Sequence, residues 1–134
     1  NREDLELVAG LFRLRQVKQN MTIFTEKMPA EALYIIKSGS IRITTMAGEG
    51  DEVGLLLLGP GEFFGEIALI QESSRAVTAR AETAAEVLML TRKDFQALID
   101  LDPRVAARIT LSIAKLLAMR VKAYSGKLRD VLLS

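Results

Sequence analysis

The chain has 134 residues, of which 49% are hydrophobic, and its 18 basic and 17 acidic residues leave a formal net charge of +1. That length is typical of one domain with one packed core. The small net charge argues against recruitment of DNA or of an anionic membrane by the overall electric field. The chain has no cysteine and no histidine, which excludes disulfides, cysteine-ligated metals and the usual general base of enzymes. We therefore expect no catalytic residue, no metal and no cofactor.

No signal peptide and no membrane-spanning segment is predicted. The longest apolar run, Leu55–Leu58, is far shorter than the 20 or so residues that a spanning helix needs. We expect a cytoplasmic protein.

The predicted elements form one domain over residues 1–134, with a helical segment at 1–12, a β-region at 13–91 and helices at 92–133. Residues 41–44 alternate apolar and polar side chains, as in a strand with one face in a core. The turn signals at 38–39 and 47–51 predict hairpins. Such short strands favour a jelly roll or sandwich over alternating strands and helices. A short helix is expected at residues 2–9, and strands at Leu14–Lys18, Met21–Thr25, Ala32–Lys37, Ser40–Met46, Val53–Leu58, Ala76–Ala81 and Glu86–Leu90.

Helical patterns begin at Thr91. Thr91 and Asp94 have the spacing of a near-capping box, and they predict a helix that includes residues 95–99. Asp102 and Pro103 then predict the cap and first residue of a second helix. This helix is expected to run from residue 104 to about residue 133.

Apolar side chains of the long helix form two stripes. The first has heptad spacing and predicts a parallel homodimer through this helix; the second, to one side of it, can pack on the β-domain. The alternative is that both stripes cover one intramolecular core. The first stripe consists of Ala107, Thr110, Ala114, Leu117, Val121, Tyr124, Leu128 and Val131, and the second of Ile109, Ile113 and Leu116.

Residues 61–79 are the only segment that indicates chemistry. Residues 65–70 can form one helical turn whose first N–H groups, with the helix dipole, favour an anion. Gly65 allows a ligand to approach the backbone, Glu66 can accept hydrogen bonds from sugar hydroxyls, and the planar fork of Arg75 suits two phosphate oxygens. The alternative is that Glu66 and Arg75 form an ordinary ion pair that closes a loop and contributes little.

This ordered pattern resembles the phosphate-binding cassette of cyclic-nucleotide-binding domains, the family of the catabolite activator protein and the regulatory subunit of protein kinase A. Residues 64–69 and 75–79 match the cassette, residues 32–43 resemble the family's central hairpin, and residues 59–65 resemble its approach to the cassette. The resemblance implies a mainly β fold with flanking α-helices: a double-stranded β-helix (jelly roll), followed by a hinge helix and a long C-terminal helix.

The resemblance also implies roles for individual residues. Arg75 would bind the cyclic phosphate beside the N–H groups of Ala68 and Ala76, and Glu66 would bind the ribose 2′-hydroxyl. By position, the long helix would contact the base through Arg120, Tyr124 and Ser125, although Tyr124 also lies on the heptad stripe. The implied ligand-binding set is Phe64, Gly65, Glu66, Ile67, Ala68, Arg75, Ala76, Val77, Ile43 and Leu55.

Two details qualify the resemblance. Lys27, Met28 and Ala30 depart from the glycines and acid that the family usually has in the turn at residues 25–31. A threonine or serine after the arginine often accompanies cyclic GMP preference in the family; Ala76 has no hydroxyl, so cyclic AMP (cAMP) is the expected ligand and cyclic GMP (cGMP) the second choice.

The expected function is a cyclic-nucleotide sensor that couples ligand binding to rearrangement or dimerisation of the C-terminal helices. Its expected partners are the cyclic nucleotide, a second copy of the chain and an effector outside this chain. The alternative function is the ligand-sensing part of a catabolite activator-like transcription regulator. Because this chain has no helix-turn-helix after the long helix, no direct DNA binding is expected.

Two further functions are weighed against these. A metal-dependent enzyme on a similar jelly roll would normally need histidines as metal ligands, and the chain has none. The second is a degenerate domain that keeps the fold but binds no ligand. The presence of Gly65, Glu66 and Arg75 together argues against it. Both are therefore less favoured than a cyclic-nucleotide sensor.

Overall fold

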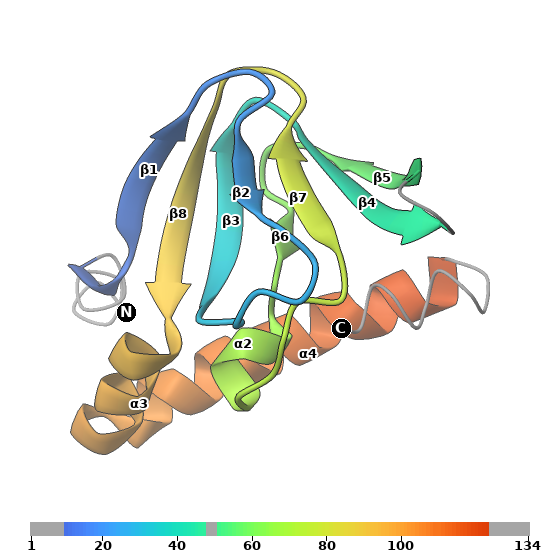
Figure 1. Ribbon diagram of the computed structural model, residues 1–134. Coiled ribbons are helices and arrows are strands. Elements are labelled where there is room, and N and C mark those ends of the chain that lie inside the picture. Colours follow the sequence, from blue (N-terminus) through green and yellow to red (C-terminus); the bar gives the residue numbers. More distant parts are fainter. Residues whose placement is uncertain (1–9, 48–50, 124–134) are drawn as a thin grey trace.

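The computed structural model describes residues 10–47 and 51–123, and its strands form two antiparallel four-stranded sheets. One sheet has the order β1-β8-β3-β6 and the other the order β2-β7-β4-β5. The predicted mainly β jelly roll with C-terminal helices is therefore confirmed (Figure 1). The strands are β1 (Arg13–Val17), β2 (Thr22–Phe24), β3 (Ala32–Ser38), β4 (Ile41–Ala47), β5 (Asp51–Leu58), β6 (Phe63–Phe64), β7 (Thr78–Ala81) and β8 (Ala85–Thr91).

Each predicted strand overlaps an observed one, but β6 was not predicted. This strand has two residues, Phe63 and Phe64, which pair with Ile35 and Tyr34 of β3. Two residues are too few for an alternating pattern to be recognised. The pairing matters for the site because it fixes the chain just before Gly65.

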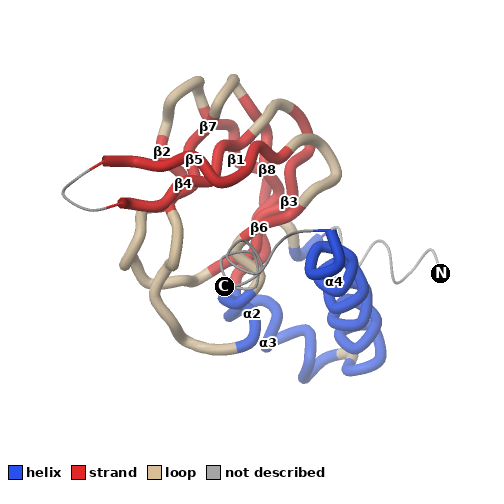
Figure 2. The backbone as a smooth tube through the Cα atoms, turned by 90° about the vertical axis from the view of Figure 1, so that its right-hand side faces the viewer, coloured by secondary structure: helices blue, strands red, loops and turns tan. Residues whose placement is uncertain are grey.

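Three of the described helices lie at one end of the roll (Figures 1 and 2): α2 (Ile67–Ile70), α3 (Arg92–Leu101) and α4 (Pro103–Ala123). The predicted helical turn at 65–70 begins two residues later than expected. Gly65 has a φ of 78°, which is incompatible with a right-handed helix.

Two hydrophobic clusters hold these layers together. The first lies between the sheets and includes Ile36, Ile41 and Val87, which are almost completely buried. The second joins the roll to the helices, and its buried members are Leu33, Phe63, Leu69, Leu90, Phe95, Leu98, Val105 and Ala106. The helices therefore pack on the same side of the roll as the chain segment that contains Gly65.

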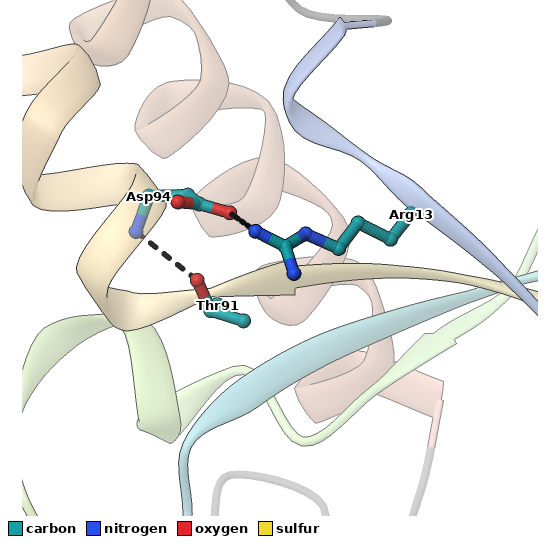
Figure 3. A network of polar contacts seen from close by, with 3 residues as sticks. All are labelled: Arg13, Thr91 and Asp94. Atoms are coloured by element: carbon teal, nitrogen blue, oxygen red, sulfur yellow. Dashed lines mark hydrogen bonds and ion pairs between the residues drawn. The ribbon is translucent and has the colours of Figure 1, made fainter.

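The caps of α3 and α4 follow the predicted pattern. Thr91 Oγ1 accepts a hydrogen bond from the Asp94 N–H at 3.1 Å, and the Asp94 carboxylate lies 3.6 Å from the Arg13 guanidinium of β1 (Figure 3). Asp102 Oδ1 accepts from the Val105 N–H at 3.2 Å, and Pro103 is the first residue of α4. Both predicted helix starts are confirmed.

The two predicted stripes of α4 are only partly correct. Ile109, Ile113 and Leu117 pack on the second cluster, whereas Leu116 is 45% exposed. Leu117 thus replaces Leu116 in the inward row, because positions four residues apart lie on one face of a helix. Ala107, Thr110 and Ala114 of the heptad stripe are exposed, so the alternative of one intramolecular core for both stripes is wrong for these residues. Leu117 belongs to the same stripe but packs inward, so at this position the intramolecular alternative is correct and the predicted heptad seam is wrong.

Parts of the sequence predictions fall outside the described residues. These are the helix expected at 2–9 and the continuation of the long helix beyond Ala123, with Tyr124, Ser125 and the end of the heptad stripe. Among the described helices, none combines the length and the apolar composition that crossing a membrane requires.

Candidate functional site

A small cavity of about 30 Å³ lies where the segment around α2 meets β4, β5 and α4. Its walls are mainly apolar, but they include one acid and two arginines, which come from different parts of the chain. The lining residues are Phe24, Ile43, Leu56, Leu58, Phe64, Gly65, Glu66, Arg75, Ala76, Val77 and Arg120.

Gly65 lies close to the guanidinium of Arg75. A Cβ atom at position 65 would lie 2.6 Å from Arg75 Nη1 and 3.1 Å from the Ala32 carbonyl oxygen. The left-handed φ of 78° adds a second reason for glycine. Glycine is thus favoured at position 65 chiefly by its left-handed backbone, and a β-carbon would also displace the end of the Arg75 side chain.

Arg75 is buried, with 7% of its surface exposed. Its Nη2 donates to the Ala32 carbonyl at 2.7 Å and its Nη1 to the Gly65 carbonyl at 3.3 Å, while its Nε has no hydrogen-bond partner among the described residues. Burial lowers the pKa of the guanidinium from its usual value, against the raising effects of Tyr34, Glu66 and Glu31. Even so, an arginine remains charged at neutral pH.

The backbone of Arg75 is tied to the turn between β2 and β3. The Arg75 N–H donates to the Met28 carbonyl at 2.7 Å, and the Lys27 N–H donates to the Arg75 carbonyl at 2.8 Å. Lys27 adopts a φ of 70° in this turn. The departures from the family pattern at Lys27 and Met28 therefore leave a turn that still holds Arg75.

Glu66 is the buried acid of the cavity, with 3% of its surface exposed. Its Oε1 has no hydrogen-bond partner among the described residues. Burial raises the pKa of Glu66 above its usual 4.5, and a backbone hydrogen bond, Arg120 and Arg75 oppose that rise. The carboxylate is therefore shielded from water, and two cations, Arg120 and Arg75, interact with it electrostatically.

Arg120 extends into the cavity from the far part of α4. Its Nη2 donates to the Phe63 carbonyl, and its guanidinium carbon lies 4.2 Å from the centre of the Phe63 ring. The long helix thus contributes a charged wall to the site, at a position where the sequence predicted a contact.

The structure brings together most of the predicted site residues. Of the described residues in that set, Leu55, Ile67 and Ala68 do not line the cavity. A bulge between Ile43 and Thr44 interrupts the pairing with β5, so that Ile43 lies opposite Leu56. The predicted wall residue Leu55 is therefore replaced by Leu56, and the alternation of side chains back from buried Leu58 was the signal for that choice.

Sequence reasoning missed Phe24, Leu56 and Leu58, which line the cavity with the predicted residues. The expectation of free N–H groups at α2 also needs correction. The Ala68 N–H donates to the Gly65 carbonyl at 3.3 Å, and the Leu69 N–H donates to the Glu66 carbonyl at 3.1 Å. Among the described residues, no cluster of three or more possible metal ligands occurs.

Comparison with known proteins agrees with this geometry. A family model described as the cyclic nucleotide-binding domain matches residues 14–102. The chain belongs to this family. The matched residues 14–102 cover α2, α3 and the described strands, apart from Arg13 at the start of β1.

Three similar proteins illustrate the relationship. The "Cyclic AMP receptor protein" of Thermus thermophilus is 38% identical over 120 residues, which are 90% of this chain and 54% of that protein. A solved structure of the Thermus thermophilus catabolite activator protein superposes with a TM-score of 0.77 at 36% identity, covering 92% of this chain and 56% of that one. "Glutaminase 1" of Bradyrhizobium diazoefficiens is 32% identical over 132 residues, which are 98% of this chain and 21% of that enzyme.

The chain therefore spans little more than half of the receptor protein and about a fifth of the glutaminase. The same kind of domain occurs in proteins of very different length. The matches show a cyclic nucleotide-binding domain like those of cAMP receptor-type regulators.

Proposed function

We propose that the domain is a sensor that binds cAMP in preference to cGMP. The observation that carries this proposal is the pair of buried side chains, Arg75 and Glu66, that line one cavity, each with an unpartnered polar atom among the described residues: Nε of Arg75 and Oε1 of Glu66. Buried polar groups without partners are costly. A ligand with an anionic phosphate and a neighbouring hydroxyl donor would satisfy both groups at once.

The apolar walls of the cavity suit the sugar and the base of a cyclic nucleotide. Ile43, Leu56 and Phe64 line the same cavity as Arg75 and Glu66, and such surfaces suit the sugar edge and the purine. Ala76 lines the cavity without a hydroxyl, which in this family favours cAMP. The name of the Thermus relative, "Cyclic AMP receptor protein", supports the same choice.

Signal output would go through α4. Because Arg120 of α4 lines the cavity and faces Glu66, a ligand beside Glu66 must change the surroundings of Arg120. If the ligand prefers one position of α4, binding shifts the helix population towards that position. The exposed heptad residues Ala107, Thr110 and Ala114 offer a second copy of the chain a face to pack against.

A second candidate is that this domain is the ligand-sensing part of a catabolite activator-like transcription regulator. The similarity to the Thermus receptor over 54% of that protein supports it. DNA binding would then belong to a segment outside this chain. The sequence of the gene beyond Ser134 tests this candidate directly.

Calorimetric titration with cAMP and cGMP tests the proposed sensor. We expect binding of both, with higher affinity for cAMP. The Arg75→Leu variant should lose about 2–5 kcal/mol of binding free energy, because it removes the partner of a buried charge.

The matched control is Arg42→Gln. Arg42 forms an ion pair with Glu82 at 2.8 Å and does not line the cavity, so its loss should leave cAMP affinity unchanged. Equal affinity of the Arg75→Leu variant and the wild type, or an equal loss in both variants, would refute the site.

A further inference from the structure

We propose that Phe24 is a positioning residue that holds the guanidinium of Arg75 ready for the phosphate. This inference rests on the proposed function and extends it to a residue of β2 for which the sequence indicated no role. Phe24 lines the cavity, and of the two rings in contact with the Arg75 guanidinium its ring is the nearer.

The contact has the geometry of a cation–π interaction. The guanidinium carbon of Arg75 lies 4.1 Å from the centre of the Phe24 ring and 5.8 Å from the centre of the Tyr34 ring. An arginine within about 6 Å of a ring centre is attracted to its negative face, and more strongly when both are shielded from water. Here both partners are buried, with 4% of Phe24 and 7% of Arg75 exposed.

The other contacts of the guanidinium are hydrogen bonds that the N–H groups at its edge donate. Two backbone carbonyls, from Ala32 and Gly65, accept its Nη hydrogens at 2.7 and 3.3 Å. The guanidinium carbon lies over the Phe24 ring, and the Nε–H has no partner among the described residues. Phe24 therefore restrains the guanidinium without using any donor, so that donors remain for the phosphate.

Phe24 is itself well supported. Its ring centre lies 5.9 Å from those of Tyr34 and of Phe64, and the latter two rings stack at 5.1 Å. Phe64 directly precedes Gly65 and Glu66 in the sequence. The three rings thus connect the support of Arg75 to the segment that carries the acid, and they limit the movement of the Phe24 ring.

An aliphatic side chain at position 24 would fill much of the same volume without the negative ring face. A Phe24→Leu variant should therefore keep the fold and lower cAMP affinity about 5- to 30-fold, the range expected for a shielded cation–π contact.

A sharper test leaves the shape of the ring almost unchanged. Phenylalanines with one, two and three ring fluorines are incorporated site-specifically at position 24, and cAMP affinity is measured by calorimetry. Fluorine withdraws charge from the ring face, so affinity should fall stepwise with each substitution. The same series at Phe95, which is buried in the second cluster on α3, should leave the affinity unchanged.

Urea unfolding of every variant separates this role from a purely structural one. The role of Phe24 is refuted if affinity is flat across its fluorine series, or falls equally in the Phe95 series, or follows the loss of stability alone. If the wild type binds cAMP, Arg75→Leu does not, and Phe24→Leu binds as the wild type does, this inference alone is wrong. If the wild type binds neither cAMP nor cGMP, the proposed function is refuted and this inference with it.

Discussion

Glu66, which we propose binds the ligand, is a side chain whose ionisation reduces the stability of the domain. Its carboxylate is buried beside Arg75 and Arg120, yet burial outweighs these cations and raises its pKa above the usual 4.5. The folded domain thus holds the Glu66 proton more tightly than the unfolded chain does. The contribution of Glu66 to stability is fully present below about pH 4.5 and is lost as the pH rises through its folded-state pKa.

The Glu66→Gln variant tests this conclusion. Because glutamine cannot ionise, the free energy of unfolding of the variant, relative to the wild type, should increase as the pH rises above 4.5 and then level off. Urea unfolding of both proteins from about pH 4 to about pH 8 measures the difference. A difference that stays constant or decreases with pH would show that burial does not control this acid.

Lys27 has a left-handed backbone conformation, which is strained for a lysine. It has a φ of 70° and an exposed side chain, and its N–H bonds to the Arg75 carbonyl. Lys27→Gly should raise the free energy of unfolding by about 0.5–1 kcal/mol, because glycine adopts this conformation without the steric cost but loses more chain entropy on folding.

Asn20 provides the control for Lys27, since it has a φ of 67° but belongs to a residue type that tolerates this region. Asn20→Gly should change stability less than Lys27→Gly when both are compared by urea unfolding. Equal effects of the two substitutions would contradict a specific strain at Lys27.

The site residues differ in how far the sequence could predict them. Glu66 and Arg75 have side chains that are rare in cores and lie within an ordered motif, so they could be recognised. The alternation of side chains back from buried Leu58 could have indicated Leu56 instead of Leu55. The bulge that leaves Leu55 without a residue opposite it on β4 depends on strand pairing, which the sequence of one strand does not reveal. Phe24 was missed because an aromatic residue in a strand ordinarily indicates a core.

At the level of elements, the start of α3 connects three segments. The Arg92 guanidinium donates to the carbonyls of Ala30 at 2.9 Å and of Ala68 at 3.1 Å, and the Arg92 N–H donates to the Glu31 carbonyl at 2.8 Å. One turn of α3 thereby touches both α2 and the turn that holds Arg75. If residues 61–79 move on ligand binding, the contacts at this helix start would change as well.

Thr91→Ala tests the cap of α3. Loss of the hydrogen bond from the Asp94 N–H should lower the free energy of unfolding by about 1 kcal/mol, measured by urea unfolding. Thr91→Ser keeps the hydroxyl and should retain most of the stability. If both substitutions cost the same, the effect comes from the missing methyl group, and the cap contributes little.

The elements with strong local signals were predicted from the sequence, and those that depend on tertiary contacts were not. The starts of α3 and α4 have side-chain caps and a proline, which are local. The choice between Leu116 and Leu117 as the inward residue of α4 depends on how the helix is rotated against the roll. That rotation is set by the second hydrophobic cluster, which draws on both halves of the chain.

For the whole molecule, the exposed face of α4 is the feature that a dimer would cover. Leu111 is 56% exposed and lies beside Ala107 and Ala114 in a shallow groove between α3 and α4. A Leu111→Glu variant should sediment as a monomer at concentrations where the wild type is a dimer, because a charge would be buried in an apolar contact. Affinity for cAMP per chain tests whether the site itself stays intact.

Ser112→Glu is the control, since residue 112 is exposed and lies about 100° further around the helix from residue 111. This variant should remain a dimer. If the wild type is a monomer in sedimentation experiments, or if Ser112→Glu dissociates as readily as Leu111→Glu, the proposed dimer face is wrong.

The size of the cavity has a consequence for timing. About 30 Å³ holds roughly two water molecules, whereas pockets for small ligands usually enclose about 300–1,000 Å³. If the domain binds a cyclic nucleotide as proposed, Arg120 and the end of α4 would have to move aside before the ligand enters, and helix movements of this kind take microseconds to milliseconds. The domain would then respond to the average level of its messenger over that interval, and briefer fluctuations would pass without a response.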